Sequence, residues 1–337
     1  MGLKMALLYG GQSGEHEVSI MSACSVLEAV DKDYMEIFPV GIGKDGRWYP
    51  GLSPQTVKAS GILEVRPLPP ADQAYAGEDL LANTGGFLLG ALKEKVDVVF
   101  PLLHGPKGED GTIQGLLELA GIPYVGAGVA ASAVGMDKAL MKAVFREKGL
   151  PVGDYRVYLR SEWREDPEGI IAAIEEALGY PCFVKPANLG SSVGISKAHD
   201  RQELAAALQT AAAYDRKLVV EAFIDGREIE CAVLGNDRPE ASVPGEIIPG
   251  AEFYDYEDKY VNTKTKLIYP AALPAETTEE IRSLAIRAFK AIDCAGFARV
   301  DFFVLRKNGQ VLVNEINTIP GFTKISMYPK LWEASGL

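Results

Sequence analysis

The stretch VDVVFPLLHGPKGEDGTIQGLLELA, residues 96–120, contains a strand, a turn and a helix in succession. The apolar run Val96 to Leu103 predicts a buried strand, and the amphipathic run Ile113 to Leu119 predicts a helix. The glycine-rich segment between them, His104 to Gly115, is the turn that opens this helix. Backbone N–H groups at such a helix start suit a carboxylate or a phosphate. The two acids in the turn mean that an anionic ligand there would need basic residues or a metal ion nearby.

The chain before this stretch alternates strand and helix. Met5 to Tyr9 and Met35 to Ile42 are predicted strands, and Glu17 to Val30 is a predicted helix. This order predicts a parallel sheet covered by helices, with ligands bound at the carboxyl ends of the strands. Glu15 and His104 each follow a predicted strand, so we expect both side chains at the same edge of the sheet.

A helix predicted from Ala133 to Lys148 marks the end of the first domain. It stops at Gly149, with Pro151 just beyond, which is a typical helix-stop signal. A smaller α/β segment follows, and a third segment contains a helix predicted from Thr277 to Asp293. The expected domains are residues 1–150, 151–235 and 236–337.

The composition limits the class of protein. With 47% hydrophobic and 24% charged residues among 337, the chain is typical of a soluble globular protein with two or three domains. The formal charge of -12 argues against a general nucleic-acid binder, because phosphate contacts need a basic surface. No apolar run is long enough for a membrane span. The four scattered cysteines predict reduced thiols in a cytoplasmic protein, and the three histidines lack zinc-site spacing.

The segment from residue 296 to residue 317 predicts a β-hairpin. Its two strand-like runs flank Lys307-Asn308-Gly309, a three-residue loop whose last position suits glycine. Counting back from this loop pairs Asp301 with Glu315. Side chains alternate along a strand, so the same face also carries Arg299 and Asn317. Opposed carboxylates repel unless a cation lies between them, and such oxygen ligands suit magnesium carrying ATP phosphates. The alternative is a solvated sheet face with an incidental acidic pair.

Other residues fit nucleotide binding or ordinary structure equally well. Lys185 ends a predicted strand and is either an edge lysine or a phosphate ligand. The loop Asn188 to Gly194 closes over phosphates or is a plain flexible hairpin. Glu221 and Glu228 are either exposed strand acids or contacts for adenine and ribose. The segment Tyr254 to Tyr260 is either an ordinary surface loop or a functional lid.

Seven blocks lie in order along nearly the whole chain, and together they resemble the D-alanine–D-alanine ligases of the ATP-grasp superfamily. The blocks are GGQSGEHEVS, LLHGPKGEDGTIQG, MDKALMK, FVKPANLGSSVG, FYDYEDKY, FARVDFF and NEINTIPGFTKISMYP. The resemblance implies an α/β ATP-grasp fold of three domains: an N-terminal parallel-sheet (pre-ATP-grasp) domain that binds substrate, a central lobe, and a C-terminal lobe with the metal and substrate site. ATP would lie between the central and C-terminal lobes.

The resemblance also implies a role for individual residues. The phosphates of ATP would be contacted by Lys138, Lys185 and Lys259. Glu221 and the Ile224 backbone would bind adenine, Glu228 would bind ribose, and Phe183 and Phe303 would form the walls of the adenine slot. Ser192 would also contact ATP. Two Mg²⁺ ions, with Mn²⁺ as a substitute, would be bound by Asp301, Glu315 and Asn317. Glu15 would bind the ammonium group of the first D-alanine, and His104 would lie near the carboxylate of that substrate. Ser191 and Tyr260 would join Glu15 in a chain that locks the lid, Arg299 and the Gly321 N–H would form the oxyanion site, and Ser326 and Met327 would face the second D-alanine.

The activity implied by the resemblance is ATP-dependent joining of two D-alanines through a D-alanyl phosphate, for peptidoglycan synthesis. The expected partners are small molecules, with no nucleic acid and no membrane, and the expected assembly is a cytoplasmic homodimer. Alternatives are a ligase that takes D-serine or D-lactate second, another ATP-grasp carboxylate–amine ligase, and a nucleotide-binding module without catalysis. Tyr260 argues against D-lactate, whereas one hydroxyl discriminates weakly against D-serine. The set around Arg299 argues against a module without catalysis.

Overall fold

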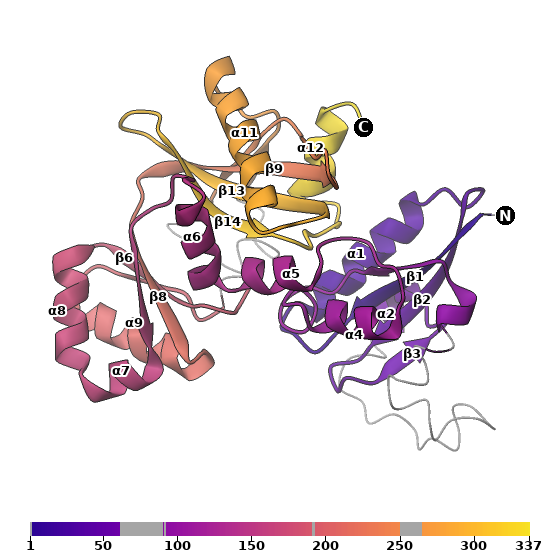
Figure 1. Ribbon diagram of the computed structural model, residues 1–337, viewed down its shortest axis with the longest axis horizontal. Helices are drawn as coiled ribbons and strands as arrows, with labels where there is room; N and C mark the ends of the chain where they lie inside the picture. Colours follow the sequence, from indigo (N-terminus) through magenta and orange to yellow (C-terminus); the bar gives the residue numbers. More distant parts are fainter. Residues whose placement is uncertain (1, 61–89, 91, 191–192, 250–264) are drawn as a thin grey trace. The chain divides into compact units, whose positions relative to one another are not determined.

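The computed structural model describes residues 2–60, 90, 92–190, 193–249 and 265–337 (Figure 1). These residues form two compact units. The first contains Met1–Ser132 together with Ile319–Ser326, and the second contains Ala133–Thr318 together with Met327–Leu337. A short segment near the C-terminus therefore belongs to the first unit. The division at residues 150 and 235 into three domains stays a prediction.

The first unit is built on a sheet in the strand order β3-β2-β1-β4. Its strands are β1 (Leu3–Gly10), β2 (Met35–Ile42), β3 (Trp48–Pro50) and β4 (Val98–Pro101), and its helices include α1 (His16–Ala29), α2 (Pro54–Ser60) and α4 (Thr112–Ala120). The strand β1 pairs in parallel with β2 and β4, which confirms the predicted parallel sheet, while β3 runs antiparallel to β2. The strand β1 lies between β2 and β4, and its residues Leu7, Leu8 and Tyr9 are fully buried.

The turn before α4 uses its own acids to satisfy backbone donors. Gly105 N–H donates to Glu109 at 2.8 Å, while the N–H groups of Lys107 and Thr112 donate to Asp110 at 2.8 and 3.0 Å. The predicted strand–turn–helix is confirmed, and Gly111 caps the helix at φ 89°. These three donors face carboxylates of the loop itself, so the expectation that they await an anionic ligand was wrong.

The helix predicted from residue 133 to residue 148 is two helices, α5 (Val129–Met136) and α6 (Lys138–Glu147). Asp137 interrupts it with extended backbone, and its carboxylate accepts from the N–H groups of Ala139 and Leu140. A short acidic side chain satisfies the first donors of a helix, and this N-cap begins a new helix instead of continuing the old one. The side chain of Lys217 also donates to Asp137 at 2.5 Å.

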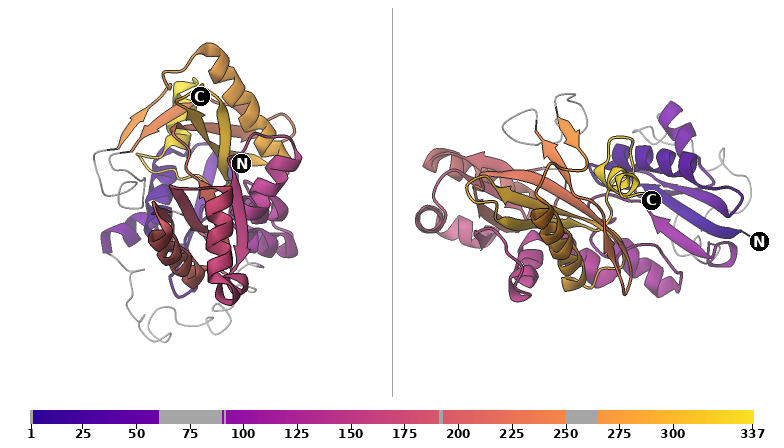
Figure 2. Two further views of the ribbon diagram at one scale, coloured as in Figure 1. Left: turned by 90° about the vertical axis from the view of Figure 1, so that its left-hand side faces the viewer. Right: turned by 90° about the horizontal axis from the view of Figure 1, so that it is seen from above.

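The second unit contains two sheets. One has the order β5-β8-β6-β7 and is packed by α9, whereas the other has the order β12-β11-β9-β13-β14 and is packed by α11 (Figure 2). The strands are β5 (Tyr155–Leu159), β6 (Cys182–Pro186), β7 (Ser196–Ala198), β8 (Lys217–Ala222), β9 (Gly226–Gly235), β10 (Glu240–Ala241), β11 (Gly245–Ile248), β12 (Lys266–Ile268), β13 (Gly296–Leu305) and β14 (Val311–Asn317). The helices are α6, α7 (Arg160–Glu165), α8 (Pro167–Ala177), α9 (Arg201–Tyr214), α11 (Ala275–Ala291) and α12 (Met327–Ala334).

An apolar face of α9 packs against the β5-β8-β6-β7 sheet of the second unit. Leu204 and Leu208 of α9 are fully buried against Val184 and Val220 of the first sheet. The four cysteines are buried free thiols. None of the helices in the described part of the chain is both long and apolar enough to cross a membrane.

Candidate active site

The hairpin of β13 and β14 places two carboxylates side by side. Asp301 lies opposite Glu315, and Arg299 lies opposite Asn317, as predicted. Gly309 has φ 74°, the left-handed conformation that the turn requires. The loop, however, is one residue longer than predicted: Leu305 N–H donates to Gln310 O at 2.9 Å, so the strands leave the turn one residue out of the expected register.

A β-bulge restores that register. Val311 is opposite Val304, but between the Phe302 and Asp301 pairs the register shifts by one residue on β14. Val311 and Val313 are buried, the next two residues are partly exposed, and Ile316 is buried again. Without the extra residue, Asn314, alternation would turn Glu315 toward the buried face. The bulge thus aims Glu315 at the same side as Asp301.

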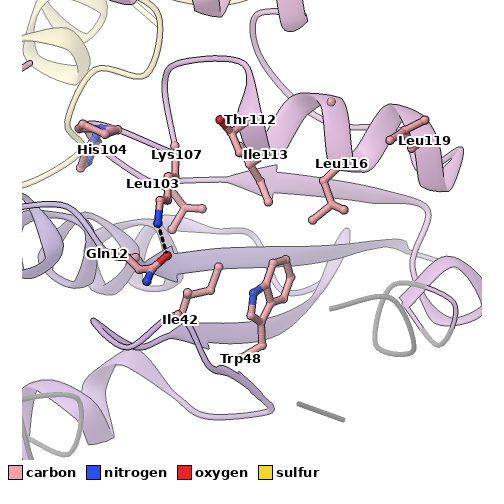
Figure 3. A pocket seen from close by; sticks show the side chains of 15 residues that line it. Gln12, Ile42, Trp48, Leu103, His104, Lys107, Thr112, Ile113, Leu116 and Leu119 are labelled. Atoms are coloured by element: carbon pink, nitrogen blue, oxygen red, sulfur yellow. Dashed lines mark hydrogen bonds between the residues drawn. The ribbon is translucent and has the colours of Figure 1, made fainter. Parts of the chain in front are cut away.

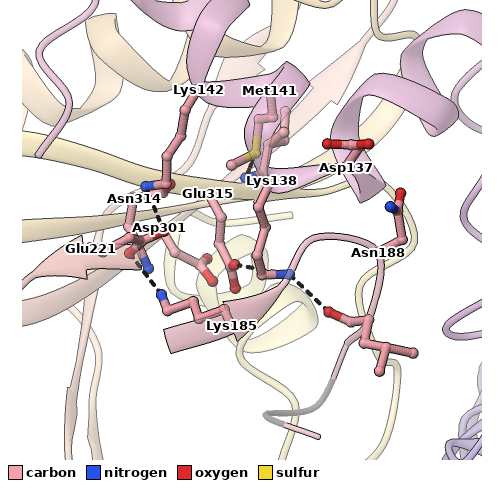
Figure 4. Close-up of polar contacts among 12 residues, drawn as sticks. Asp137, Lys138, Met141, Lys142, Lys185, Asn188, Glu221, Asp301, Asn314 and Glu315 are labelled. Atoms are coloured by element: carbon pink, nitrogen blue, oxygen red, sulfur yellow. Dashed lines mark hydrogen bonds and ion pairs between the residues drawn. The ribbon is translucent and has the colours of Figure 1, made fainter. Parts of the chain in front are cut away.

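The two carboxylates line a cavity of about 360 Å³ in the second unit. Figure 4 shows Lys138 directed toward Glu315 and Lys185 directed toward Glu221, with Asp301 beside them. The cavity is also lined by the residues predicted for adenine, ribose and the oxyanion site, namely Phe183, Glu221, Ile224, Glu228, Arg299 and Phe303. The structure therefore brings together residues from 138 to 315 that the sequence placed far apart.

Glu221 lies between two lysines in this site. Its Oε2 accepts from Lys185 Nζ at 2.8 Å, and its Oε1 is 3.2 Å from Lys142 Nζ. Burial raises the pKa of Glu221, but the two ammonium groups outweigh that effect and lower the pKa to about 2. Lys142 is itself only 4% exposed at its side chain, and burial lowers its pKa despite Glu221. Glu221 is thus a permanent anion held in a fixed orientation.

Arg299 forms a second charged group with two acids. Its Nε and Nη2 each donate to an oxygen of Asp301 at 2.7 Å, and its Nε is 3.2 Å from Glu230 Oε1. Burial lowers the pKa of Arg299, but Asp301 and Glu230 raise it well above its usual range. Lys138 lies 3.9 Å from Glu315 and donates to Leu189 O at 2.8 Å. Cations therefore already face both carboxylates of the pair.

The donor chemistry fits magnesium. Asp301, Glu315 and Asn317 offer oxygen ligands of the kind that Mg²⁺ prefers, and the fold sets the two acids opposite each other. Within the described residues no group of three or more His, Cys, Asp or Glu side chains is placed to hold a metal ion. Two carboxylates with an amide leave positions for phosphate oxygens and water, which is how Mg²⁺ is commonly bound with nucleotides.

Aromatic side chains form one wall of the cavity. The Phe183 and Phe223 rings lie 6.4 Å apart between centroids, and Lys185 Nζ lies 5.9 Å from the Phe183 centroid. Phe303 is opposite Glu228 across β13 and β9. An apolar slot bordered by a carboxylate suits a purine with its ribose.

The first unit holds a different set of predicted residues. Glu15 is the N-cap residue of α1, and its Oε2 lies beside Gly105. His104 is 4% exposed; its Nδ1 is 2.9 Å from Ile319 O and its Nε2 is 3.3 Å from Ser22 Oγ. Burial lowers the pKa of His104, but Glu109 and Glu15 outweigh that effect and raise it.

Gly321 has little room for a side chain. A Cβ there would lie 2.8 Å from Ser326 Oγ, which itself accepts the N–H of Thr323 at 3.0 Å. The same unit contains a largely apolar pocket of about 400 Å³ between β2, β3 and α4, beside a hydrogen bond from Lys107 to Gln12 at 2.7 Å (Figure 3). Ile42, Trp48 and Leu116 line it.

The remaining predicted residues have other settings. Asn317 lies at the end of β14 and is not among the residues that line the cavity. Met327 is 3% exposed, and a Cβ at Gly245 would overlap its Cε. Four residues lie outside the described part of the chain: Ser191, Ser192, Lys259 and Tyr260.

Sequence reasoning missed Lys142, and it gave Glu230, which lies beside Glu228 on the same predicted strand, no role in the site. Lys142 lies four residues after Lys138, so helical spacing places both lysines on one side of α6. Glu230 is two residues from Glu228 on β9 and directly opposite Asp301. Both signals were available, but only pairing of β9 with β13, which is remote in sequence, explains why Glu230 meets Arg299.

Comparison with known proteins agrees with this geometry. A family model described as D-ala D-ala ligase N-terminus matches residues 4–127, and one described as D-ala D-ala ligase C-terminus matches residues 144–337. The chain belongs to the D-alanine–D-alanine ligase family. A D-alanine–D-alanine ligase of Acetivibrio thermocellus is 53% identical over 345 residues, covering 99% of this chain and 92% of the relative. One of Thermoanaerobacter sp. is 56% identical over 341 residues, with the same coverage.

Solved structures of the family show the same fold. The D-alanine-D-alanine ligase from Coxiella burnetii is 42% identical with a TM-score of 0.80, covering 100% of this chain and 90% of that one. A D-Ala:D-Ser ligase from Enterococcus faecalis is 35% identical with a TM-score of 0.80, covering 100% and 96%. The ATP-grasp fold expected from the sequence is confirmed.

Proposed function

We propose that this protein joins two D-alanines to D-alanyl-D-alanine with the hydrolysis of ATP to ADP and phosphate, for peptidoglycan precursors. The observation that carries the proposal is the cavity of the second unit, in which paired carboxylates, lysines and an aromatic wall meet in a chain of this family. Named relatives at 53% and 56% identity over nearly the whole chain support the same activity.

The nucleotide is held by the second unit. Lys138 and Lys185 bind phosphate oxygens, and Glu221 and the Ile224 backbone bind adenine. Glu228 binds the ribose, while Phe183 and Phe303 pack on the base. Asp301, Glu315 and Asn317 hold two Mg²⁺ ions, with Mn²⁺ as a substitute, and the metal supplies charge neutralisation for the transferred phosphoryl group.

The reaction has two steps, and both build negative charge. A carboxylate oxygen of the first D-alanine attacks the γ-phosphorus of ATP, which forms an acyl phosphate and releases ADP. The amine of the second D-alanine then attacks the acyl carbon, loses a proton, and expels phosphate. Arg299 and the Gly321 N–H stabilise the developing oxyanion.

Other residues select the amino acids. Glu15 binds the ammonium of the first D-alanine. His104 lies near that substrate's carboxylate. Ser326 and Met327 lie toward the second D-alanine. Ser192 and Lys259 contact ATP. Ser191 and Tyr260 join Glu15 in a hydrogen-bond chain that locks the lid, because an acyl phosphate must be protected from water.

D-alanine is the better-supported second substrate. The relatives at about half identity carry the D-alanine–D-alanine name, whereas the structure named as a D-Ala:D-Ser ligase is 35% identical. Membership of this ligase family also argues against the alternative that the protein only binds a nucleotide without catalysis.

Product analysis tests the proposal. The protein is incubated with ATP, Mg²⁺ and equal amounts of D-alanine, D-serine and D-lactate, with L-alanine as the stereochemical control. We expect D-alanyl-D-alanine as the main product and one phosphate per dipeptide. A main product containing D-serine or D-lactate would reject the second substrate, and ATP turnover independent of D-alanine would reject the ligase.

The assembly and location follow the family resemblance. We propose a homodimer, which light scattering after size exclusion tests by the molar mass of the native protein, and residence in the cytoplasm. The buried free thiols are consistent with a reducing compartment.

A further inference from the structure

Helix α1 buries two serines on one side, three residues apart. Ser19 and Ser22 are both fully buried, and a buried hydroxyl needs hydrogen-bond partners. Ser19 Oγ donates to Leu102 O and accepts Gly10 N–H, so it connects the ends of β4 and β1. Ser22, one turn further along the helix, contacts different elements.

Ser22 connects His104 with the segment from residue 319 to residue 322. The N–H of Phe322 donates to Ser22 Oγ at 3.1 Å, and Ser22 Oγ lies 3.3 Å from His104 Nε2. On the other side of the imidazole, Nδ1 lies 2.9 Å from Ile319 O. A carbonyl oxygen only accepts, so Nδ1 carries a proton. Nε2 therefore accepts from Ser22 when the imidazole is neutral and donates to it when the imidazole is charged.

These three contacts form a closed ring. The ring runs from Phe322 N–H through Ser22 and His104 to Ile319 O, and the backbone between Ile319 and Phe322 completes it. Gly321 lies inside that short backbone segment. The Phe322 ring also packs edge-on against Phe100 at 5.9 Å, which fixes the same segment from its side chain. The backbone N–H of Phe322, the carbonyl of Ile319 and the Phe322 ring thus restrain the short segment that contains Gly321.

We propose that Ser22 is a positioning residue that, together with His104, holds the Gly321 backbone N–H in the orientation required to stabilise the oxyanion. The inference rests on the proposed ligase function, in which that N–H faces developing negative charge. An oxyanion donor is useful only when its direction is fixed before the reaction. The segment that contains Gly321 is anchored by Ser22 of α1 and by His104, which lies three residues after β4.

The first test is local and does not depend on activity. Hydrogen exchange at the Phe322 amide is measured in the wild type, in Ser22→Ala, and in Ser132→Ala. Ser132 is a matched control, because it is also fully buried in the first unit but donates to Ala127 O, away from the ring. We expect about five- to ten-fold faster exchange of Phe322 in Ser22→Ala alone, the equivalent of one neutral hydrogen bond.

The second test uses kinetics and the histidine signal. We expect kcat of Ser22→Ala to fall about 10- to 100-fold while KM for ATP stays within about two-fold, since a misplaced donor affects the transition state. The chain has three histidines, so the His104 imidazole can be followed by NMR. The pKa of His104 should change in Ser22→Ala, because the variant removes the hydroxyl beside Nε2. The neighbouring carboxylates Glu109 and Glu15, which also affect this pKa, stay the same.

Unchanged Phe322 exchange, or a kcat loss no larger than that of Ser132→Ala, would overturn the proposal. Should Ser22→Ala fail to fold, Ser22→Cys retains a small side chain with a weak donor, and its intermediate exchange rate provides the same comparison. Wild-type protein without D-alanine-dependent ATP turnover would remove the ligase function, while the exchange experiment would still report on the ring.

Discussion

Replacing Lys142 by methionine tests the buried charge arrangement of the nucleotide site. Methionine has similar length but no charge, so the change removes the ammonium 3.2 Å from Glu221 and the donor to Asn314 O at 3.1 Å. The pKa of Glu221 falls from 4.5 to about 2, which corresponds to about 3 kcal/mol of stability at neutral pH. Two lysines share that effect, so Lys142 contributes about half of it.

Burial of Lys142 works in the opposite direction. Its own pKa is lowered, so removing the ammonium recovers part of its desolvation cost. We therefore expect Lys142→Met to destabilise the second unit by about 1 kcal/mol, a melting-temperature decrease of about 2 to 4 °C for a unit of this size. The same variant should bind ATP more weakly, because Glu221 is held by one lysine instead of two.

The pH dependence of this effect has a defined sign. A carboxyl group whose pKa is lowered by folding stabilises the protein above its unfolded pKa, and that stability is lost as the pH falls toward about 2. The difference between wild type and Lys142→Met should therefore be largest near neutral pH and decrease below about pH 4. Calorimetry across this range measures it, with Lys148→Met, an exposed lysine that ends the same helix, as the control. A difference equal to that of the control, or one that grows on acidification, would show that Lys142 does not stabilise the Glu221 carboxylate.

Three further changes probe other parts of the account. Glu315→Gln keeps the shape of the bulged strand but removes a metal-ligand charge, so D-alanine-dependent phosphate release should fall at least about 100-fold with little change in melting temperature. Asp137→Ala removes the N-cap of α6 and should lower the unfolding free energy by about 1 to 2 kcal/mol, measured by denaturant titration. Gly321→Ala places a Cβ 2.8 Å from Ser326 Oγ, so kcat should fall by about ten-fold or more while ATP binding, measured by calorimetry, is preserved.

Each of these changes has a contradicting result. Turnover retained in Glu315→Gln would remove its carboxylate from the metal site. An unchanged denaturation midpoint in Asp137→Ala would mean that α5 and α6 are separated by something other than this cap. Wild-type kcat in Gly321→Ala would show that the backbone at that position tolerates displacement.

Local rules predicted much of the fold and part of the site. Alternation and an expected three-residue turn predicted Asp301 opposite Glu315, and the parallel pairing of β1 with β2 and β4 followed from the strand–helix order. The pairing was right although the turn was wrong, because a longer loop and a bulge at Asn314 offset each other. At the bulge, Lys142 of α6 donates to Asn314 O at 3.1 Å, a contact that alternation within one hairpin does not encode.

Other features depended on contacts remote in sequence. Asp137 is a good N-cap residue, yet the apolar spacing on both sides of it favoured one continuous helix. The sequence suggested that Glu109 and Asp110 would disfavour an anionic ligand at the turn after Leu103. In the structure these carboxylates instead accept hydrogen bonds from backbone N–H groups of the same turn. Ser22 carries no motif that indicates a role, since its partners are 82 and 300 residues away.

The most direct test of the central claim is to locate the metal in crystals grown with Mn²⁺ and a non-hydrolysable ATP analogue. Anomalous scattering from Mn²⁺ identifies its position without assumptions about the ligands. We expect metal density within about 2.1 Å of carboxylate oxygens of both Asp301 and Glu315, beside the phosphates. Metal bound elsewhere, with Asp301 and Glu315 facing only Arg299 and Lys138 in the nucleotide complex, would contradict it.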